Sequence, residues 1–172
     1  MSKLDGVLGT IDRISEKSGS IAKWFMAACF FVVFYDVVAR YLFNSATIWA
    51  YDMAYFFYAA NFLLAGCYVQ RHHSHIRVDV IFNLLSQRNR AILEACFYIV
   101  LTIPLIAILT YSTIIFAADS WLCWEASMYT VWHPPVYPIK TVIALGYSLL
   151  LLQALSDFVR CLRTIVEGDS AL

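Results

Sequence analysis

Few side chains in this sequence combine reactive chemistry with an unusual position. Asp36 and Arg40 stand four residues apart inside a long apolar stretch. Side chains at this spacing meet on one face of a helix, and an unpaired charge among apolar groups costs several kcal/mol. Two roles are open for Asp36. We favour a structural ion pair or a contact with a partner chain over a carboxylate that binds a proton or a substrate.

Histidine and cysteine supply the other candidate ligands. His72, His73 and His75 crowd one polar segment beside two arginines. Such a run is more typical of a pH-sensitive cationic patch facing lipid headgroups than of a metal site. The cysteines are scattered, at Cys29, Cys67, Cys96, Cys123 and Cys161. They form no C-x-x-C pair and are interpreted as small apolar side chains, so no metal and no cofactor is predicted.

The sequence carries no pattern that is typical of an enzyme. It has no phosphate loop and no nucleophile elbow. A haem protein of the membrane would need histidines within its apolar stretches, and a quinone-linked disulfide enzyme would need paired cysteines in a polar loop. Neither is present, so no catalytic residue is predicted.

The elements that must position these residues are four apolar stretches, at about 21–43, 48–69, 92–118 and 138–159. The chain is 62% hydrophobic and only 14% charged, with a mean hydropathy of +0.70. Each stretch reaches the roughly 20 residues that a helix needs to cross a bilayer core, where open structures other than helices cannot satisfy their backbone. We therefore predict an all-α membrane protein, a bundle of four transmembrane helices that forms a single domain over residues 1–172.

The distribution of basic residues predicts the orientation. Twelve basic and twelve acidic residues balance, which argues against nucleic acid as a partner. Ten basic residues lie on one side of the predicted spans: Lys3, Arg13, Lys17, Lys23, Arg71, Arg77, Arg88, Arg90, Arg160 and Arg163. Only Arg40 and Lys140 flank the other side. The positive-inside rule then places both termini and the segment 70–91 in the cytoplasm.

Two amphipathic stretches are predicted to lie on the membrane surface. Apolar residues recur at helical spacing over about 4–18, and again over about 76–87 in the cytoplasmic loop. The first stretch also raises the question of a signal peptide. It contains acidic residues, and the apolar run after it is too long for a signal sequence, so we expect it to be retained.

The predicted outer loop at 119–137 is rich in aromatic residues and has no lysine or arginine. Its aromatic members are Trp121, Trp124, Tyr129, Trp132 and Tyr137. Rings of this kind anchor a protein at the level of the lipid headgroups, which is the interpretation we favour. The alternative is a docking surface for another protein.

Several polar residues stand near the ends of the predicted spans. Asp52, Glu94, Gln153 and Asp157 are expected to be solvated or to pair with headgroups, as terminal charges usually are. Pro104 lies within the third stretch and removes one backbone hydrogen bond, so we expect a kink there that serves packing.

With this topology in place, the residue pattern resembles the small membrane subunit of tripartite ATP-independent periplasmic (TRAP) transporters, the DctQ-like family. The resemblance rests on Arg40-Tyr41-Leu42-Phe43, on Trp49, on Gly66 and on His75-Ile76-Arg77-Val78-Asp79. In the second half it rests on Ser120-Trp121, Glu125-Ala126-Ser127, Tyr137-Pro138-Ile139-Lys140 and Leu151-Leu152-Gln153. One departure is Tyr51-Asp52, where the family commonly has an acidic pair.

The resemblance implies a three-part transporter in a bacterial inner membrane. A periplasmic solute-binding protein captures an organic acid, a large permease subunit moves it inward with sodium, and the small subunit supports the scaffold of the large one. The candidate contact or structural residues are Asp36, Arg40, Trp49, Asp52, Arg77, Asp79, Trp121, Glu125 and Lys140. Arg77 and Asp79 would hold the cytoplasmic surface helix in place, and the aromatic outer loop would face the docked binding protein.

Two other functions remain open at this point. One is a self-sufficient, small proton-coupled exporter in which Asp36 binds cation and proton alternately. The strong charge bias argues against it, because such exporters carry weak bias. The other is an assembly subunit of an unrelated membrane complex.

Overall fold

The computed structural model describes residues 3–72, 87–128 and 130–167, and these are almost entirely helical. The α-helices are α1 (Lys3–Leu42), α2 (Ala50–Arg71), α4 (Gln87–Phe97), α5 (Ile103–Leu122) and α6 (Tyr137–Glu167). A π-helical turn, η1 (Tyr98–Thr102), joins α4 to α5, so that these three elements form one long rod. All four predicted apolar stretches are therefore helices.

Three of the rods are long and apolar enough to cross a membrane. They run over Gly6–Leu42, Ile92–Leu122 and Tyr137–Ile165. The helix α2 has 22 residues, but it carries Asp52, Asn61 and several tyrosines among its apolar side chains. Because of these polar residues, α2 is not among the three helices that are apolar enough to cross a membrane. That α2 crosses the membrane stays a prediction.

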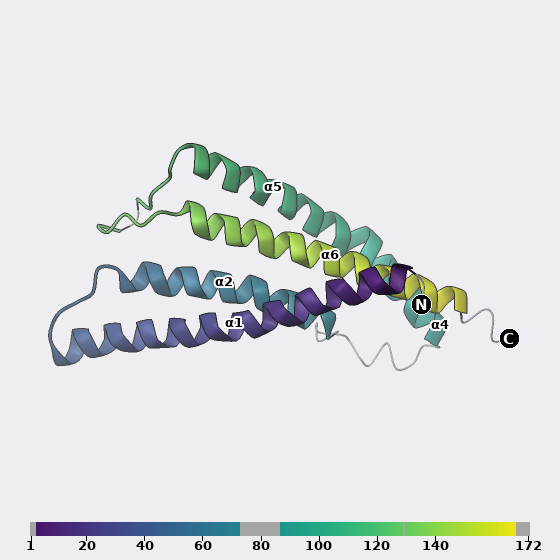
Figure 1. Cartoon of the computed structure of the whole chain (residues 1–172), viewed down its shortest axis with the longest axis horizontal. Coiled ribbons are helices and arrows are strands. Elements are labelled where there is room, and N and C mark those ends of the chain that lie inside the picture. Colours follow the sequence, from purple (N-terminus) through teal and green to yellow (C-terminus); the bar gives the residue numbers. More distant parts are fainter. Residues whose placement is uncertain (1–2, 73–86, 129, 168–172) are drawn as a thin grey trace.

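The four long helices lie in a row and not in the predicted bundle. The order along the row is α1, α2, α6, α5 (Figure 1). Each helix packs on the next, whereas the described parts of α1 and α5 do not pack on each other. A bundle closes so that apolar faces are hidden from water, but lipid can cover apolar faces directly. Phe30 and Phe31 on α1 and Ile108 on α5 are accordingly left exposed.

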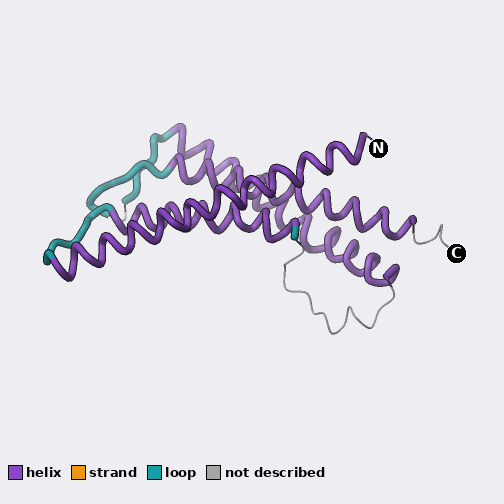
Figure 2. The backbone as a smooth tube through the Cα atoms, turned by 60° about the horizontal axis from the view of Figure 1, so that its bottom comes forward, coloured by secondary structure: helices purple, strands orange, loops and turns teal. Residues whose placement is uncertain are grey.

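The row consists of two hairpins that come together at one end. Figure 2 shows the α1–α2 and α5–α6 loops at one end of the molecule, and the start of α1 and the end of α6 at the other. At the end with the termini, α1 reaches past α2 and contacts α6 (Figure 1). We call this the inner end and the opposite one the outer end. The hairpins separate toward the outer end.

The helix α1 is continuous through the predicted surface helix and the predicted first span. It runs for 40 residues without a break between 18 and 21. At the inner end a Cβ on Gly19 would lie 2.6 Å from the ring of Tyr68, so a glycine is needed where α1 meets α2. That residues 4–18 lie on the membrane surface stays a prediction. The second predicted surface helix, 76–87, falls outside the described residues except for Gln87.

At Pro104, where a kink was predicted, the helix contains the π-helical turn η1 just before the proline. Proline cannot donate to the carbonyl four residues earlier, and its ring collides with that carbonyl. The turn before it widens, and the N–H of Ile103 bonds to the carbonyl of Tyr98, five residues back. One extra residue in a turn relieves the collision without ending the helix.

Candidate subunit-contact sites

The turn between α1 and α2 at the outer end is fastened by Asp36. Its carboxylate accepts a hydrogen bond from Arg40 at 2.7 Å and another from the hydroxyl of Thr47. Asn44 turns the chain with a φ of 49°, a left-handed conformation that asparagine tolerates well. The predicted ion pair is therefore present, and it holds the turn together with Thr47.

Trp49 stands beside this turn, directly before α2. Its ring stacks on Tyr35 of α1 with 5.7 Å between the ring centroids. The stacked rings join the outer ends of the two helices at a level where aromatic side chains are favoured in membranes. Trp49, Asp36 and Arg40 thus belong to one cluster, which we call the α1–α2 cap.

The loop between α5 and α6 is organised around Lys140. The residue is 6% exposed, although it is charged and lies in the first turn of α6. Its ammonium donates to Glu125 and lies 3.6 Å from the ring centroid of Phe116. The ion pair and the aromatic face together compensate the buried charge. The hydrogen bond from Lys140 keeps the pKa of Glu125 below its usual range.

Backbone hydrogen bonds give this loop a defined shape. The N–H of Ser127 donates to the carbonyl of Pro134 at 2.8 Å, and the N–H of Val136 donates to the carbonyl of Glu125 at 2.9 Å. Trp121 donates from its indole to Thr141 at 2.8 Å and packs against Tyr137, with 4.3 Å between the centroids. We call this folded loop with Lys140 the α5–α6 cap.

The tip of the α5–α6 cap leaves large apolar side chains uncovered. Leu122, Trp124, Met128 and Val131 are 80%, 70%, 92% and 83% exposed. A flexible loop would not hold such groups apart from one another, whereas the backbone bonds of the cap do. The tip suits both predicted interpretations, an aromatic belt among headgroups and a docking surface.

Asp52 connects the two caps and corrects one prediction. The hydroxyl of Thr130 in the α5–α6 loop donates to its carboxylate at 2.5 Å, and Asp52 is only 6% exposed. The prediction that Asp52 is solvated is therefore wrong. It lies at the start of α2 in the middle of the row, where the neighbouring hairpin covers it.

A second polar cluster, at the inner end, was not predicted as a site. Gln153 and Asp157 of α6 are both fully buried, at 0% exposure. Gln153 accepts from Ser15 of α1 at 2.7 Å and donates to Asp157 at 3.1 Å. Gln70 of α2 donates to Tyr98 at 3.0 Å and to Asp157 at 3.4 Å. We call these five residues the inner polar network.

Ion pairs surround the inner polar network. Asp12 of α1 accepts from Arg160 of α6 at 2.5 Å, and Arg71 at the end of α2 pairs with Glu16. These pairs connect α1 to both middle helices. The prediction that Gln153 and Asp157 are solvated at a span end is thus wrong, because α1, α2 and the π-turn enclose them.

The candidate residues fall into separate places in the structure. Asp36, Arg40 and Trp49 share the α1–α2 cap, Trp121, Glu125 and Lys140 share the α5–α6 cap, and Asp52 bridges toward the latter. Arg77 and Asp79 lie outside the described residues. Within the described parts of the chain, no three His, Cys, Asp or Glu side chains come close enough to hold a metal ion.

A signal for the inner polar network does exist in the sequence. Gln153 and Asp157 are four residues apart, as are Asp12 and Glu16, so each pair shares a helix face. Two polar pairs, each on one helix face and both toward the predicted cytoplasmic side, are compatible with a polar contact between the two helices. These polar residues lie near the predicted span ends, where exposure to lipid headgroups explains the same pattern. The sequence alone therefore did not indicate that they are buried.

Comparison with known proteins agrees with these observations. Residues 29–164 match the protein-family model described as the DctQ component of tripartite ATP-independent periplasmic transporters. Over 82 residues the chain is 33% identical to the C4-dicarboxylate TRAP transporter small permease protein DctQ of Vibrio cholerae serotype O1. That alignment covers 45% of this chain and 35% of the relative, about a third of its length. Since the family match extends from the middle of α1 nearly to the end of α6, the chain belongs to the DctQ family of TRAP transporter components.

Proposed function

We propose that this chain, as the small permease subunit, supports the scaffold of a large permease subunit during sodium-driven uptake of an organic acid. A periplasmic binding protein would deliver the acid. Proteins of the DctQ family are components of transporters and not enzymes. The uptake, the driving ion and the two partner proteins form the proposed part of this statement.

The observation that carries the proposal is how the buried polar groups are used. Gln70 of α2 and Gln153 of α6 both donate to Asp157 of α6, and hydrogen bonds with Ser15 and Tyr98 add α1 and η1 to the network. A subunit that carries solute needs polar groups that face its substrate, whereas a supporting subunit uses them to join its own helices. A row of joined helices makes a broad wall in the bilayer, against which a moving permease can slide.

We propose a topology of four spans with both termini in the cytoplasm of a bacterial cell, in the inner membrane. The inner end carries Arg71 and Arg160, and the outer end carries Arg40 and Lys140. Ten of the twelve basic residues belong to segments predicted on the inner side, and only these two to the outer side. This supports an outer end in the periplasm under the positive-inside rule.

The two caps would then face the periplasm. We propose that the exposed apolar tip of the α5–α6 cap lies at the level of the headgroups or against the docked binding protein. Asp36, Arg40 and Trp49 would shape the neighbouring surface. That Arg77 and Asp79 hold the cytoplasmic surface helix in place stays a prediction.

The substrate class proposed is an organic acid. The relative from Vibrio cholerae is described as a C4-dicarboxylate transporter protein. Recognition of the acid would lie in the other two components, so this chain carries no preference of its own.

The proposal is tested by reconstitution in liposomes with a sodium gradient. The purified chain alone should take up no labelled organic acid, whereas the chain with its large permease and binding protein should. Uptake by the chain alone that disappears in Asp36→Asn would establish the exporter function instead. Full uptake by the other two components without this chain would remove the supporting role.

A further inference from the structure

One face of α2 carries a stripe of aromatic side chains, three of them tyrosines. Tyr51, Tyr55, Tyr58 and Phe62 follow at spacings of four, three and four residues, which places them on one side of the helix. They are 72%, 60%, 57% and 65% exposed. The middle helix of the row therefore presents an aromatic surface that neither α1 nor α6 covers.

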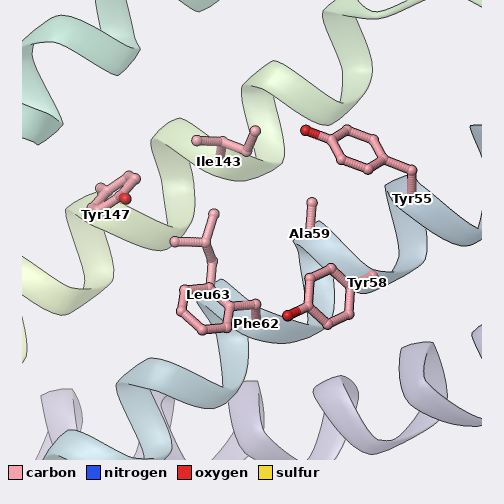
Figure 3. A pocket seen from close by; sticks show the side chains of 7 residues that line it. All are labelled: Tyr55, Tyr58, Ala59, Phe62, Leu63, Ile143 and Tyr147. Atoms are coloured by element: carbon pink, nitrogen blue, oxygen red, sulfur yellow. The ribbon is translucent and has the colours of Figure 1, made fainter.

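This stripe borders a hollow between α2 and α6 of about 280 Å³, which we call the tyrosine groove. It is lined by Tyr55, Tyr58, Ala59, Phe62, Leu63, Ile143 and Tyr147 (Figure 3). Figure 3 shows the α2 side chains on one side of the hollow and Ile143 and Tyr147 of α6 on the other. Both middle helices contribute hydroxyl groups to it.

The groove has a structural cause in the contact between α2 and α6. A Cβ on Gly146 would lie 2.8 Å from the Cβ of Leu63, so the helices touch where α6 has no side chain. The thiol of Cys67 donates to the carbonyl of Gly146 at 3.6 Å on the inner side of this contact. From there outward the hairpins diverge, and the groove occupies the widening space.

The depth of the tyrosine hydroxyls in the bilayer indicates what kind of partner could occupy the tyrosine groove. Tyr58 is eight residues from the start of α2 and Tyr147 is ten from the start of α6, which is about 12 Å and 15 Å at 1.5 Å per residue. Both lie near the middle of a bilayer core of about 30 Å, too deep to reach the headgroups. Among the described residues, neither hydroxyl has a hydrogen-bond partner.

Lipid tails offer no partner to a hydroxyl, whereas a protein helix does. On α5 the exposed side chains between Leu105 and Phe116 are aliphatic or phenylalanine apart from Tyr111 and Ser112. Such a surface needs only lipid. Three tyrosines around one groove need hydrogen-bond acceptors at two levels, which serine, threonine or asparagine side chains of a membrane helix can provide.

We propose that the tyrosine groove is the docking surface for a transmembrane helix of the large permease subunit, one that carries hydrogen-bonding side chains facing Tyr58 and Tyr147. The inference depends on the proposed function for the identity of the partner. The chemistry of the helix follows from the groove itself.

Photocrosslinking in the intact transporter tests the docking surface. A photoreactive amino acid is placed at Tyr58 or Tyr147, and at Phe31 of α1 or Ile108 of α5 as controls that are 67% and 64% exposed. We expect crosslinks to the large permease from the two groove positions, several-fold above the controls. Crosslinks from the groove only to lipid, or only to a second copy of this chain, would overturn the inference.

The result separates this inference from the proposed function. If the large permease co-purifies with this chain but crosslinks from the control positions and not from the groove, the docking surface is wrong and the function stands. If the large permease does not co-purify and uptake does not depend on this chain, the proposed function itself fails.

Removing single hydroxyl groups gives a second test, in which the structural change and the expected effect are both small. The variants Tyr58→Phe and Tyr147→Phe keep the rings, and each should weaken the complex in detergent about threefold, as interhelical hydrogen bonds in membranes do. Tyr111→Phe on α5 is the matched control and should change nothing. Equal effects at all three positions, or no effect at any, would contradict hydrogen bonding to a docked helix.

Discussion

The two ends of the helix row are held together by different means. At the inner end, the polar side chains of Ser15, Gln70, Gln153 and Asp157 meet in the protein interior and join α1, α2 and α6. At the outer end, each hairpin closes its own loop with its own ion pair, and Thr130 reaches across to Asp52. Hydrogen bonds that are fully buried constrain geometry more strongly than those near water. The comparison indicates a buried inner joint and two outer caps that are each closed by their own ion pair and linked by the Thr130–Asp52 hydrogen bond. The tyrosine groove lies in the widening space between the two hairpins.

The largest effect is expected from breaking the inner joint with Gln153→Leu. The change leaves the Ser15 hydroxyl and one oxygen of Asp157 without their amide partner in a buried site. Each such loss costs about 1–3 kcal/mol, so for the two groups we expect a destabilisation of about 2–6 kcal/mol. The thermal midpoint of the detergent-solubilised protein measures this. Leu155→Met, at an exposed position on the same helix, is the control, and an unchanged midpoint for Gln153→Leu would show that the joint lies elsewhere.

A smaller and more local effect is expected from Thr130→Val. This variant keeps the side-chain shape but removes the donor to Asp52, which is 6% exposed. Hydrogen bonds to charged groups contribute about 1.5–3 kcal/mol, and the half-buried position of Thr130 favours the lower value. Spin labels at Tyr51 and Cys123 should report a broader distance distribution at the outer end.

The comparison between the two ends supplies the control for this experiment. Labels at His72 and Leu162, at the inner end, should give an unchanged distribution in Thr130→Val, and Thr130→Ser should behave as the unmodified chain. If both ends broaden together, the caps are not independent of the inner joint.

The ion pair of the α5–α6 cap predicts an acid-sensitive loop. Because Lys140 lowers the pKa of Glu125, the pair stabilises the loop fully above the usual glutamate pKa of about 4.3. That contribution is lost as the pH falls below this value and through the lowered pKa. Tryptophan emission from Trp121 and Trp124 should shift over this range.

Lys140→Met tests the cause of that shift. The variant should show the shifted emission already at neutral pH and lose the acid transition. An acid transition that persists in Lys140→Met would assign it to another carboxyl group. The inner joint should be unaffected in either case.

The smallest effect is expected from Asp36→Asn. Asp36 pairs with Arg40 four residues later near the end of α1, and the Arg40 side chain is 56% exposed. Exposed ion pairs of this kind contribute little to the free energy of unfolding. The hydrogen bond from Thr47 can also persist to an amide oxygen. We expect about a twofold or smaller decrease in assembled transporter and no change in sodium stoichiometry. An altered stoichiometry would move ion binding into this subunit.

Much of the helical architecture could be predicted from hydropathy, including the outer ends of α1 and α6 to within one residue, whereas the extension of both helices at the inner end could not. The first span was predicted at 21–43 and the last at 138–159, whereas α1 covers Lys3–Leu42 and α6 covers Tyr137–Glu167. Hydropathy reports the part of a helix that suits lipid. Both helices continue past that part, because charged residues of the inner end pair with one another and sustain the helix.

The site residues were predictable where the relevant contact is local. Asp36 and Arg40 form the pair that their spacing predicts. The contacts of Asp52 with Thr130 and of Gln153 with Ser15 join residues 78 and 138 positions apart, and neither was anticipated. Position relative to a span end is visible in a sequence, but whether another helix covers that position is not.

By itself, the sequence determined that the chain is helical, apolar enough for a membrane and similar to the DctQ family, because composition and residue order carry this information. The tertiary structure alone decided that the helices form a row, that Asp157 and Gln153 are buried, and that a groove opens between α2 and α6 beyond their contact at Gly146. The physical reason is that lipid accepts any apolar face. Hydrophobicity therefore cannot select which faces meet, and that choice falls to a few polar contacts and to the close approach at Gly146.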